Sequence, residues 1–195
     1  PNGDAGMLVP SVESFREYQL KNAWVWEHQA LTRARFCAGD PAVGARFEAI
    51  RREILCQPRD MAKLREEVLA MRKRMLDSHA SNSDTEFDIK QDPGGIIDVE
   101  FIVQYLVLGH AHAHPELASN LGNIALLRIT AGLGLIPQEL AEPVREAYRI
   151  YRRLQHAKRL NGSPKARAER AAVSQHIDAV RALWHAVLDT PASKG

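Results

Sequence analysis

Cysteine is scarce in this sequence, with only Cys37 and Cys56 among 195 residues. Two cysteines at this separation supply neither a metal-ligand spacing nor a disulfide framework. We therefore expect both to be reduced and mostly buried, in a protein that works in the cytoplasm. No apolar run reaches the length of a membrane span and no signal segment opens the chain, so we expect no membrane partner.

An excess of charge of one sign is also lacking. The chain has 26 Lys and Arg against 24 Asp and Glu, a formal net charge of +2. This near balance makes nucleic-acid binding the weakest of the functions considered, and we expect no nucleic-acid partner. An initiator methionine is missing, which predicts that the chain is a fragment of a longer protein.

What the sequence does contain is helical periodicity. Hydrophobic residues make up 45% of the chain, enough for one sizeable core. We predict an all-α fold built on a helical bundle of six or seven helices joined by short turns. The apolar spacing and the capping residues place the expected helical segments at about 11–20, 24–37, 40–55, 60–79, 97–112, 120–135, 137–160 and 166–188.

The stretch from Phe87 to Tyr105 combines a turn signal, several charges and a helix start. Pro fixes φ and glycine accepts positive φ, so Asp92-Pro93-Gly94-Gly95 predicts a tight turn before the helix at 97–112. In that helix Glu100 shares a stripe with Gln104, whereas Asp98 points to the opposite side.

The two carboxylates of this helix should therefore have separate roles. Asp98 lies in the first turn, where capping by its side chain is favoured over catalysis. Glu100 lies on an otherwise apolar helix, and burying a carboxylate there requires a partner. Lys90 or an arginine from another helix is the expected partner. Structural and functional roles for Glu100 and Lys90 remain equally open.

Two groups of arginines are candidates for binding anions. Arg33 and Arg35 follow Trp26 and His28, and together they form either a surface for a nucleotide or a solvated helix face. In the segment 137–160 the side chains of Arg145, Arg149, Arg152 and Arg159 fall on one stripe. This candidate docking stripe suits a polyphosphate or an acidic protein surface, or it is a solvated face with carboxylate partners.

Three alternating histidines, at positions 110, 112 and 114, are the one further cluster of possible metal ligands. In a helix only the first and the last of the three would approach each other, so we expect no metal site there.

The central stretch resembles the Lys-x-x-Pro-Gly-Gly-Ile-x-Asp-x-Glu-Phe motif of the bifunctional glutamine synthetase adenylyltransferase/adenylyl-removing enzymes. The likeness continues in the segments Trp24–Arg35 and Pro1–Val9, and its wording is similar to the C-terminal, adenylyltransferase half. In that family the metal-binding aspartates form an Asp-x-Asp pair. No such pair occurs in this chain, so the resemblance implies that it carries no catalytic aspartates.

The resemblance implies a division into residues 1–39, the end of a nucleotidyltransferase domain with its connecting helices, and residues 40–195, the helical bundle. It also implies an enzyme that uses ATP and Mg²⁺ to adenylylate a tyrosine of glutamine synthetase, under control of glutamine and the PII signalling protein. Neither cofactor is expected to bind this fragment tightly, and the fragment alone should be inactive.

Within that picture Lys90, Arg33 and Arg35 would contact phosphate, and Glu100 would orient Lys90 or an arginine, all facing an upstream nucleotidyltransferase domain of the same chain. The alternative is a regulatory or docking module that binds PII, glutamine or glutamine synthetase without touching nucleotide.

Overall fold

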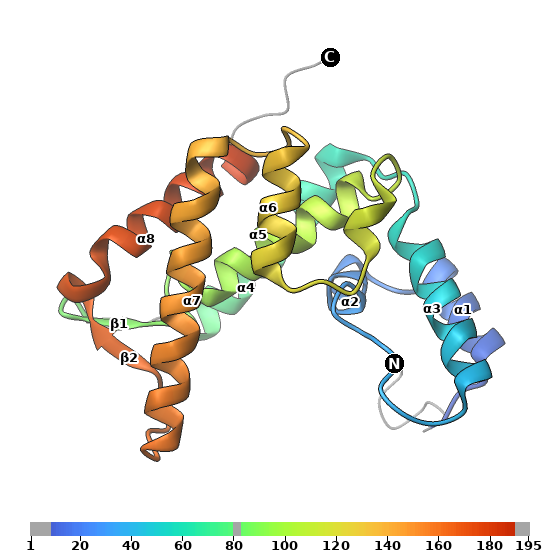
Figure 1. Cartoon of the computed structure of the whole chain (residues 1–195), viewed down its shortest axis with the longest axis horizontal. Coiled ribbons are helices and arrows are strands. Elements are labelled where there is room, and N and C mark those ends of the chain that lie inside the picture. Colours follow the sequence, from blue (N-terminus) through green and yellow to red (C-terminus); the bar gives the residue numbers. More distant parts are fainter. Residues whose placement is uncertain (1–8, 80–82, 190–195) are drawn as a thin grey trace.

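The computed structural model describes residues 9–79 and 83–189 (Figure 1). Helices dominate this part of the chain, so the all-α prediction is confirmed. The eight α-helices of this part fall in the eight expected segments, one or two more than the six or seven helices predicted for the bundle. The short apolar segment Met7-Leu8-Val9 lies mostly outside the described residues. The α-helices are α1 (Val12–Lys21), α2 (Val25–Leu31), α3 (Pro41–Leu55), α4 (Met61–His79), α5 (Ile96–His110), α6 (Asn123–Gly132), α7 (Gln138–Leu160) and α8 (Arg170–Trp184).

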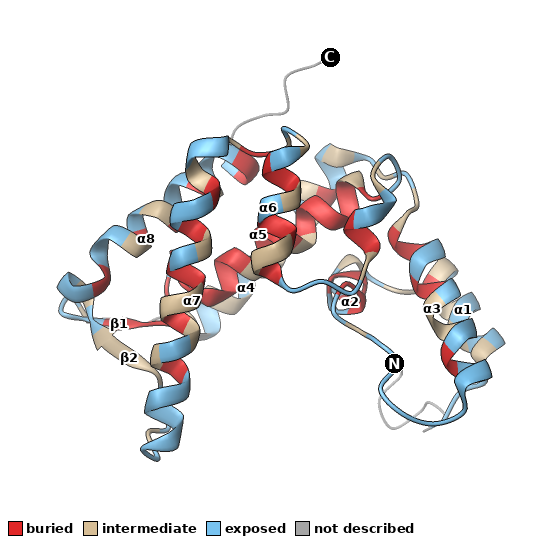
Figure 2. Ribbon diagram, viewed as in Figure 1, coloured by how far each residue is buried: buried red, intermediate tan, exposed pale blue. Residues whose placement is uncertain are grey.

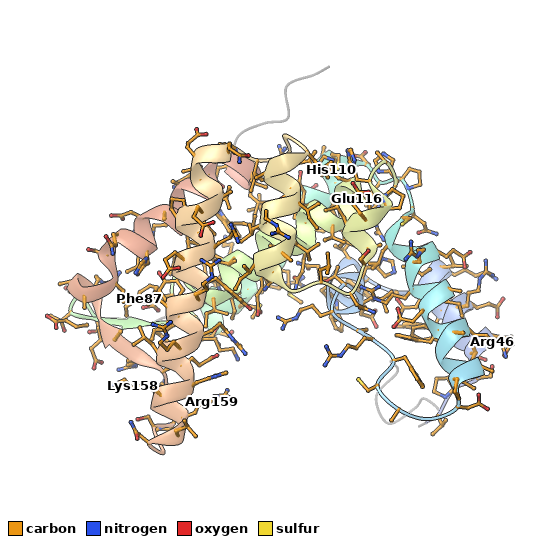
Figure 3. All side chains as sticks on the ribbon, in the orientation of Figure 1. Arg46, Phe87, His110, Glu116, Lys158 and Arg159 are labelled. Carbon is orange, nitrogen blue, oxygen red and sulfur yellow. The ribbon has the colours of Figure 1, made fainter. Side chains whose placement is uncertain are left out.

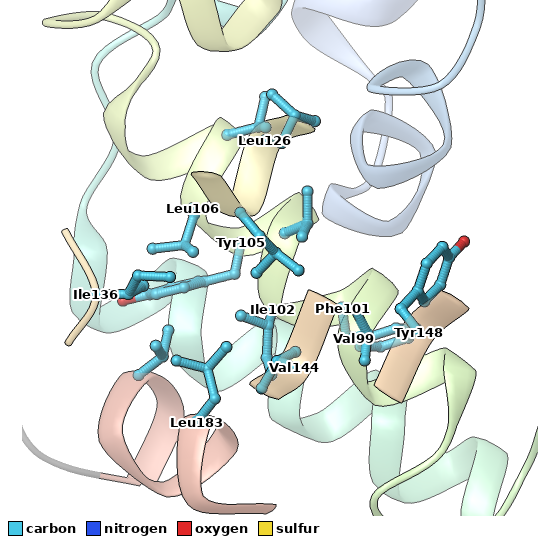
Figure 4. Packing of buried hydrophobic residues seen from close by; sticks show 14 of the residues in the cluster. Val99, Phe101, Ile102, Tyr105, Leu106, Leu126, Ile136, Val144, Tyr148 and Leu183 are labelled. Atoms are coloured by element: carbon cyan, nitrogen blue, oxygen red, sulfur yellow. The ribbon is translucent and has the colours of Figure 1, made fainter. Parts of the chain in front are cut away.

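Helix α5 is the centre of the bundle. Twelve of its 15 residues are buried, because nearly all of them are apolar and the helix has no solvated face. It contacts α2, α4, α6, α7 and α8. In Figure 4 Ile102, Tyr105 and Leu106 lie among side chains of α6, α7 and α8. Since each fully buried large side chain contributes about 1.5–3 kcal/mol, this helix supplies much of the folding energy.

The turn that precedes α5 depends on its two glycines. Gly94 has φ of 95°, a conformation that L side chains rarely adopt. A Cβ atom on Gly95 would lie 2.6 Å from the carbonyl oxygen of Ile89 and 2.9 Å from that of Asp92. The chain therefore turns where Asp92-Pro93-Gly94-Gly95 predicts, and α5 begins at Ile96, one residue before the expected start.

A buried ion pair joins this turn to α4. Asp98 accepts hydrogen bonds from Arg72 Nε at 2.5 Å and from the backbone N–H of Gly94 at 2.6 Å. Arg72 also donates from Nη2 to the carbonyl of Gln91 at 2.7 Å. The N-cap residue of α5 is Gly95, and Asp98 binds the backbone N–H of Gly94, just before the helix. The sequence pattern did not indicate its other partner, Arg72.

Two short strands were not expected from the sequence. β1 (Glu86–Asp88) pairs antiparallel with β2 (Arg167–Glu169), and Phe87 lies opposite Ala168. Residues 166–169 were predicted to be helical, which is wrong: α8 starts at Arg170. The reason is tertiary, because the buried Phe87 ring packs 5.9 Å from that of Tyr151 and 5.5 Å from the guanidinium of Arg170 (Figure 3).

The two ends of the molecule differ in burial (Figure 2). Buried residues concentrate where α5 meets α4, α6, α7 and α8, whereas α1 and α3 form a more exposed pair joined by stacking of Phe15 on Phe47, with ring centroids 5.7 Å apart. Cys37 is exposed and Cys56 is partly buried, so the prediction that both are mostly buried is wrong for Cys37. Of the helices in residues 9–79 and 83–189, none is long and apolar enough to cross a membrane.

Helix α2 is shorter than expected but rich in buried polar groups. It ends at Leu31 instead of Cys37, and Glu27, His28 and Gln29 are all buried. Glu27 accepts hydrogen bonds from the Tyr18 hydroxyl at 2.9 and 3.0 Å and from the backbone N–H of Trp24 at 2.9 Å. These contacts fix the start of the helix.

The imidazole of His28 lies 3.0 Å from the carbonyl oxygen of Gln19 through Nε2. A carbonyl only accepts, so Nε2 carries the proton and donates. Burial, followed by the positive charge of Arg59, lowers the pKa of His28 below its ordinary value of 6.5. The folded protein therefore keeps this ring neutral at pH values where the unfolded chain protonates it.

We expect replacement of Asp98 by Ala to destabilise the fold by about 3–5 kcal/mol, because Arg72 is left buried and unpaired. Urea denaturation measures this loss, with Asp77→Ala, which removes an exposed carboxylate of α4, as the control. The double variant Asp98→Ala/Arg72→Met should recover part of the loss, since it removes the orphaned charge. A double variant as unstable as the single one would contradict this assignment.

The depressed pKa of His28 predicts acid sensitivity. Stability from the neutral ring is complete above the unfolded-state pKa of about 6.5 and decreases as the pH falls below it. Each withheld proton contributes a slope of up to about 1.4 kcal/mol per pH unit. His28→Gln keeps a donor for Gln19 but does not titrate, so its free energy of unfolding should decline less between about pH 7 and pH 5.5. Equal slopes for the two proteins would exclude a role for His28.

Candidate functional site

The polar stripe of α5 faces the end of α2. Gln29 donates from Nε2 to Oε1 of Gln104 at 3.0 Å, and Nη1 of Arg33 lies 2.5 Å from Oε1 of Glu100. The expected arginine from another segment is therefore Arg33, two residues beyond α2. Glu100 and Asp98 contact different segments, in agreement with their predicted placement on opposite sides of α5.

A buried arginine holds the chain in place just before Arg33. Arg51, from α3, is 2% exposed and donates to the carbonyls of Leu31 at 3.0 Å, Thr32 at 2.8 Å and Ala118 at 2.7 Å. The carbonyls at the end of a helix have no partner within it and carry partial negative charge, so a guanidinium suits them. Arg51 thus stops α2 and directs the following residues to the surface.

Glu100 is also bound from α7. The hydroxyl of Tyr148 donates to Oε1 of Glu100 at 3.2 Å and accepts from Nδ2 of Asn123 at 3.0 Å. Burial raises the pKa of Tyr148, and the charge of Glu100 raises it further, so this hydroxyl stays protonated and donates. Burial lowers the pKa of Arg33, but the charge and hydrogen bond of Glu100 outweigh it and raise the pKa overall.

Two adjoining surface hollows open beside this cluster, with volumes of about 390 and 260 Å³. Arg33, Leu121 and Gly122 line both. Gly122 is the N-cap of α6 and brings no side chain to the unpaired N–H groups of that helix. The basic side chains at the two hollows are Arg33, Arg35 and Arg152. We call Arg33, Arg35, Glu100, Asn123, Tyr148 and Arg152 the arginine cluster.

Such a cluster suits a phosphate group. Guanidinium groups bind phosphate oxygens in pairs, and a helix N-terminus adds N–H donors and a favourable dipole. Glu100 has a positioning role, because it lies beneath the surface with its carboxylate on Arg33 and Tyr148. Among residues 9–79 and 83–189, no three His, Cys, Asp or Glu side chains are placed to hold a metal ion.

Lys90 lies outside the arginine cluster. It is exposed and lines a separate hollow of about 550 Å³ with Arg159 and Lys165, where Asp77 and Asp88 balance part of the charge. Lys90 and Glu100 share no hollow. Glu100 therefore orients an arginine, the second of the two predicted alternatives.

The predicted docking stripe on α7 is divided by its partners. Arg145 pairs with Glu142, and Arg149 lies 3.0 Å from Glu142 and 2.9 Å from Glu146, as expected of a solvated face. Arg152 instead joins the arginine cluster, and Arg159 lines the Lys90 hollow.

Sequence reasoning missed Tyr148 and Asn123. Tyr148 follows the apolar spacing of α7, although a buried tyrosine hydroxyl needs a hydrogen-bond partner and so signals a polar neighbour. Asn123 carried no such signal. The predicted surface around α2 is also split, because Trp26 and His28 line a different hollow from Arg33 and Arg35.

Comparison with known proteins bears on this geometry. A family model described as GlnD PII-uridylyltransferase matches residues 62–185, and one described as glutamate-ammonia ligase adenylyltransferase matches residues 1–50. A bifunctional glutamine synthetase adenylyltransferase/adenylyl-removing enzyme of Aromatoleum aromaticum is 62% identical over 186 residues, 94% of this chain and 19% of the relative. The chain belongs to this adenylyltransferase family.

Other members of the family are similar over much of the same span. The enzymes of Nitrosomonas eutropha and Chromobacterium violaceum are 60% and 54% identical, over 85% and 97% of this chain and 18% and 21% of the relatives. The chain thus spans about a fifth of the length of the adenylyltransferases it matches.

The Arg33–Glu100 ion pair lies at the surface of this adenylyltransferase-family chain and should add little stability. The side chain of Arg33 is 51% exposed and that of Glu100 is 20% exposed, and pairs of this kind contribute up to about 1 kcal/mol. Glu100→Gln should change the free energy of unfolding in urea by no more than this, in contrast to Asp98→Ala. A loss as large as that of Asp98→Ala would show that Glu100 serves the fold and not the surface.

Proposed function

We propose that this chain is the helical part of an adenylyltransferase that attaches AMP to a tyrosine of glutamine synthetase, and that its arginine cluster faces the nucleotide. The observation that carries the proposal is the placement of Arg33. The carboxylate of Glu100 holds its guanidinium, and the hydroxyl of Tyr148 binds the same carboxylate. Arg35 and Arg152 line the hollows beside it. The family relationship supports the reaction class.

In the proposed reaction the tyrosyl oxygen releases its proton to water and forms a bond with the α-phosphorus of ATP, while the bond to the bridging oxygen breaks and pyrophosphate leaves. Negative charge accumulates on the phosphoryl oxygens in the transition state. Arginines held in advance in one geometry stabilise that charge without reorganisation. Arg33 is held in this way by Glu100, and Arg35 and Arg152 add positive charge beside it.

The Mg²⁺ that such a transfer uses finds no ligand set among the described residues. A nucleotidyltransferase domain of the same protein would supply the metal site in this proposal. The helical bundle would supply cations, a wall that excludes water, and a docking surface. Control by glutamine and the PII protein belongs to the same proposal, and the Lys90 hollow, with Arg159 and Lys165, offers it an exposed basic surface.

Transfer of labelled AMP from ATP to glutamine synthetase tests the role of the arginine cluster in the complete enzyme that carries this chain. Arg33→Gln and Arg35→Gln should each lower kcat about tenfold or more, because they remove charge that acts on the transition state. Arg46→Gln, which alters an exposed arginine paired with Glu13 far from the cluster, is the matched control.

Two results would contradict the proposal in different ways. Full transfer rates in both cluster variants would exclude contact with the nucleotide. Full basal rates combined with lost control by glutamine or PII would favour the regulatory and docking function, which needs no nucleotide at this surface. Mixing this chain with a separately purified nucleotidyltransferase domain then shows whether the bundle completes the active site.

A further inference from the structure

A hollow of about 530 Å³ lies between the start of α2 and the outer face of α4. It shares no lining residue with the arginine cluster or with the Lys90 hollow. Its volume is in the range of small-molecule sites, about 300–1,000 Å³. The side chains that give it its character are Trp24, Trp26, His28, Arg59, Lys63 and Arg74. We call it the tryptophan hollow.

Two large aromatic side chains are exposed at this hollow. Trp24 is 63% exposed and Trp26 is 42% exposed, although the chain buries most of its other large apolar groups. The backbone that carries them is fixed, because Glu27 accepts from the N–H of Trp24 and from the hydroxyl of Tyr18. Indole rings on a rigid backbone offer stacking surfaces to a planar heteroaromatic ring.

The charge of the hollow favours an anion. Arg59, Lys63 and Arg74 contribute three positive charges, and Glu67 is the only carboxylate in the lining. Burial lowers the pKa of Arg59, which shows that its charge is held at a cost where water is scarce. A phosphate group at the rim would compensate the excess charge.

Two residues that line the hollow, His28 and Arg59, each have a buried nitrogen without a hydrogen-bond partner. His28 is 6% exposed, and Nδ1 of its ring has no hydrogen-bond partner; the same holds for Nε of Arg59. Because Nε2 of His28 carries the proton, Nδ1 is an acceptor, whereas Nε of Arg59 is a donor. Buried groups of this kind cost free energy unless a partner is supplied. A purine, with ring nitrogens and an exocyclic amine, supplies both.

We propose that the tryptophan hollow is a second anion site, which binds a phosphorylated purine nucleoside by stacking on Trp24 and Trp26 and by ion pairing with Lys63 and Arg74. It is separate from the arginine cluster, and it leaves the transferred group untouched. A ligand there joins α2 to α4.

Tryptophan fluorescence of the 195-residue chain tests this proposal with ADP as the probe. The third tryptophan, Trp184, is removed as Trp184→Phe, so that only Trp24 and Trp26 report. ADP should quench the emission saturably. Trp26→Leu and Arg74→Gln should each weaken binding about tenfold or more, since each removes one of the two interactions. Circular dichroism establishes that the variants keep the fold.

Matched controls locate the site. Lys73→Gln changes the same charge on the neighbouring residue of α4, which does not line the hollow, and should leave ADP binding unchanged. Arg33→Gln should also leave it unchanged, which separates this site from the proposed nucleotide surface of the arginine cluster. Adenosine and pyrophosphate should each bind more weakly than ADP.

Several outcomes would overturn the proposal. They are absence of saturable quenching, equal loss of binding in Lys73→Gln and Arg74→Gln, dependence on Arg33, or binding of pyrophosphate as tightly as ADP. Quenching by glutamine synthetase or the PII protein with none by ADP would identify a protein contact instead of a nucleotide site. Full transfer rates in Arg33→Gln would exclude the proposed role of the arginine cluster but would not affect this result, because the two readouts depend on different residues.

Discussion

A buried ion pair between Arg72 and Asp98 holds α4, α5 and the turn before α5 in a fixed arrangement. Asp98 accepts hydrogen bonds from the backbone N–H of Gly94 and from Nε of Arg72, and Arg72 also donates to the carbonyl of Gln91. One carboxylate therefore sets the turn, the start of α5 and the position of α4. Because both charged groups are almost fully removed from water, neither can lose its partner without a large cost.

The central helix divides its polar residues between holding the fold and shaping a surface. Asp98 is directed to α4 and is buried, whereas Glu100 and Gln104 meet α2 on the opposite side. Apolar residues around the rest of α5 form the core, so these polar contacts decide how the surrounding helices are oriented. The same helix thus fixes the bundle and presents Arg33 at the surface.

The short helix α2 links the arginine cluster to the tryptophan hollow. Its start carries Trp24 and Trp26, and its end leads to Arg33 and Arg35, with buried Glu27, His28 and Gln29 between them. Arg51 stops the helix at Leu31 by binding three carbonyls. In our proposals these two ends serve different ligands.

The sequence by itself determined the helical class, the turn at Asp92-Pro93-Gly94-Gly95 and the opposite orientation of Asp98 and Glu100, because each follows from local rules of backbone conformation and helical periodicity. Only the tertiary structure decided the partners. Arg72 lies 26 residues from Asp98, Tyr148 lies 48 residues from Glu100, and Asn123 lies 25 residues from Tyr148. The early end of α2 and the strand at Arg167–Glu169 likewise depend on Arg51 and Phe87, which are distant in sequence. Local propensity is weak beside such contacts, since burial of a charge or an aromatic ring outweighs the preference of a few residues for a helix.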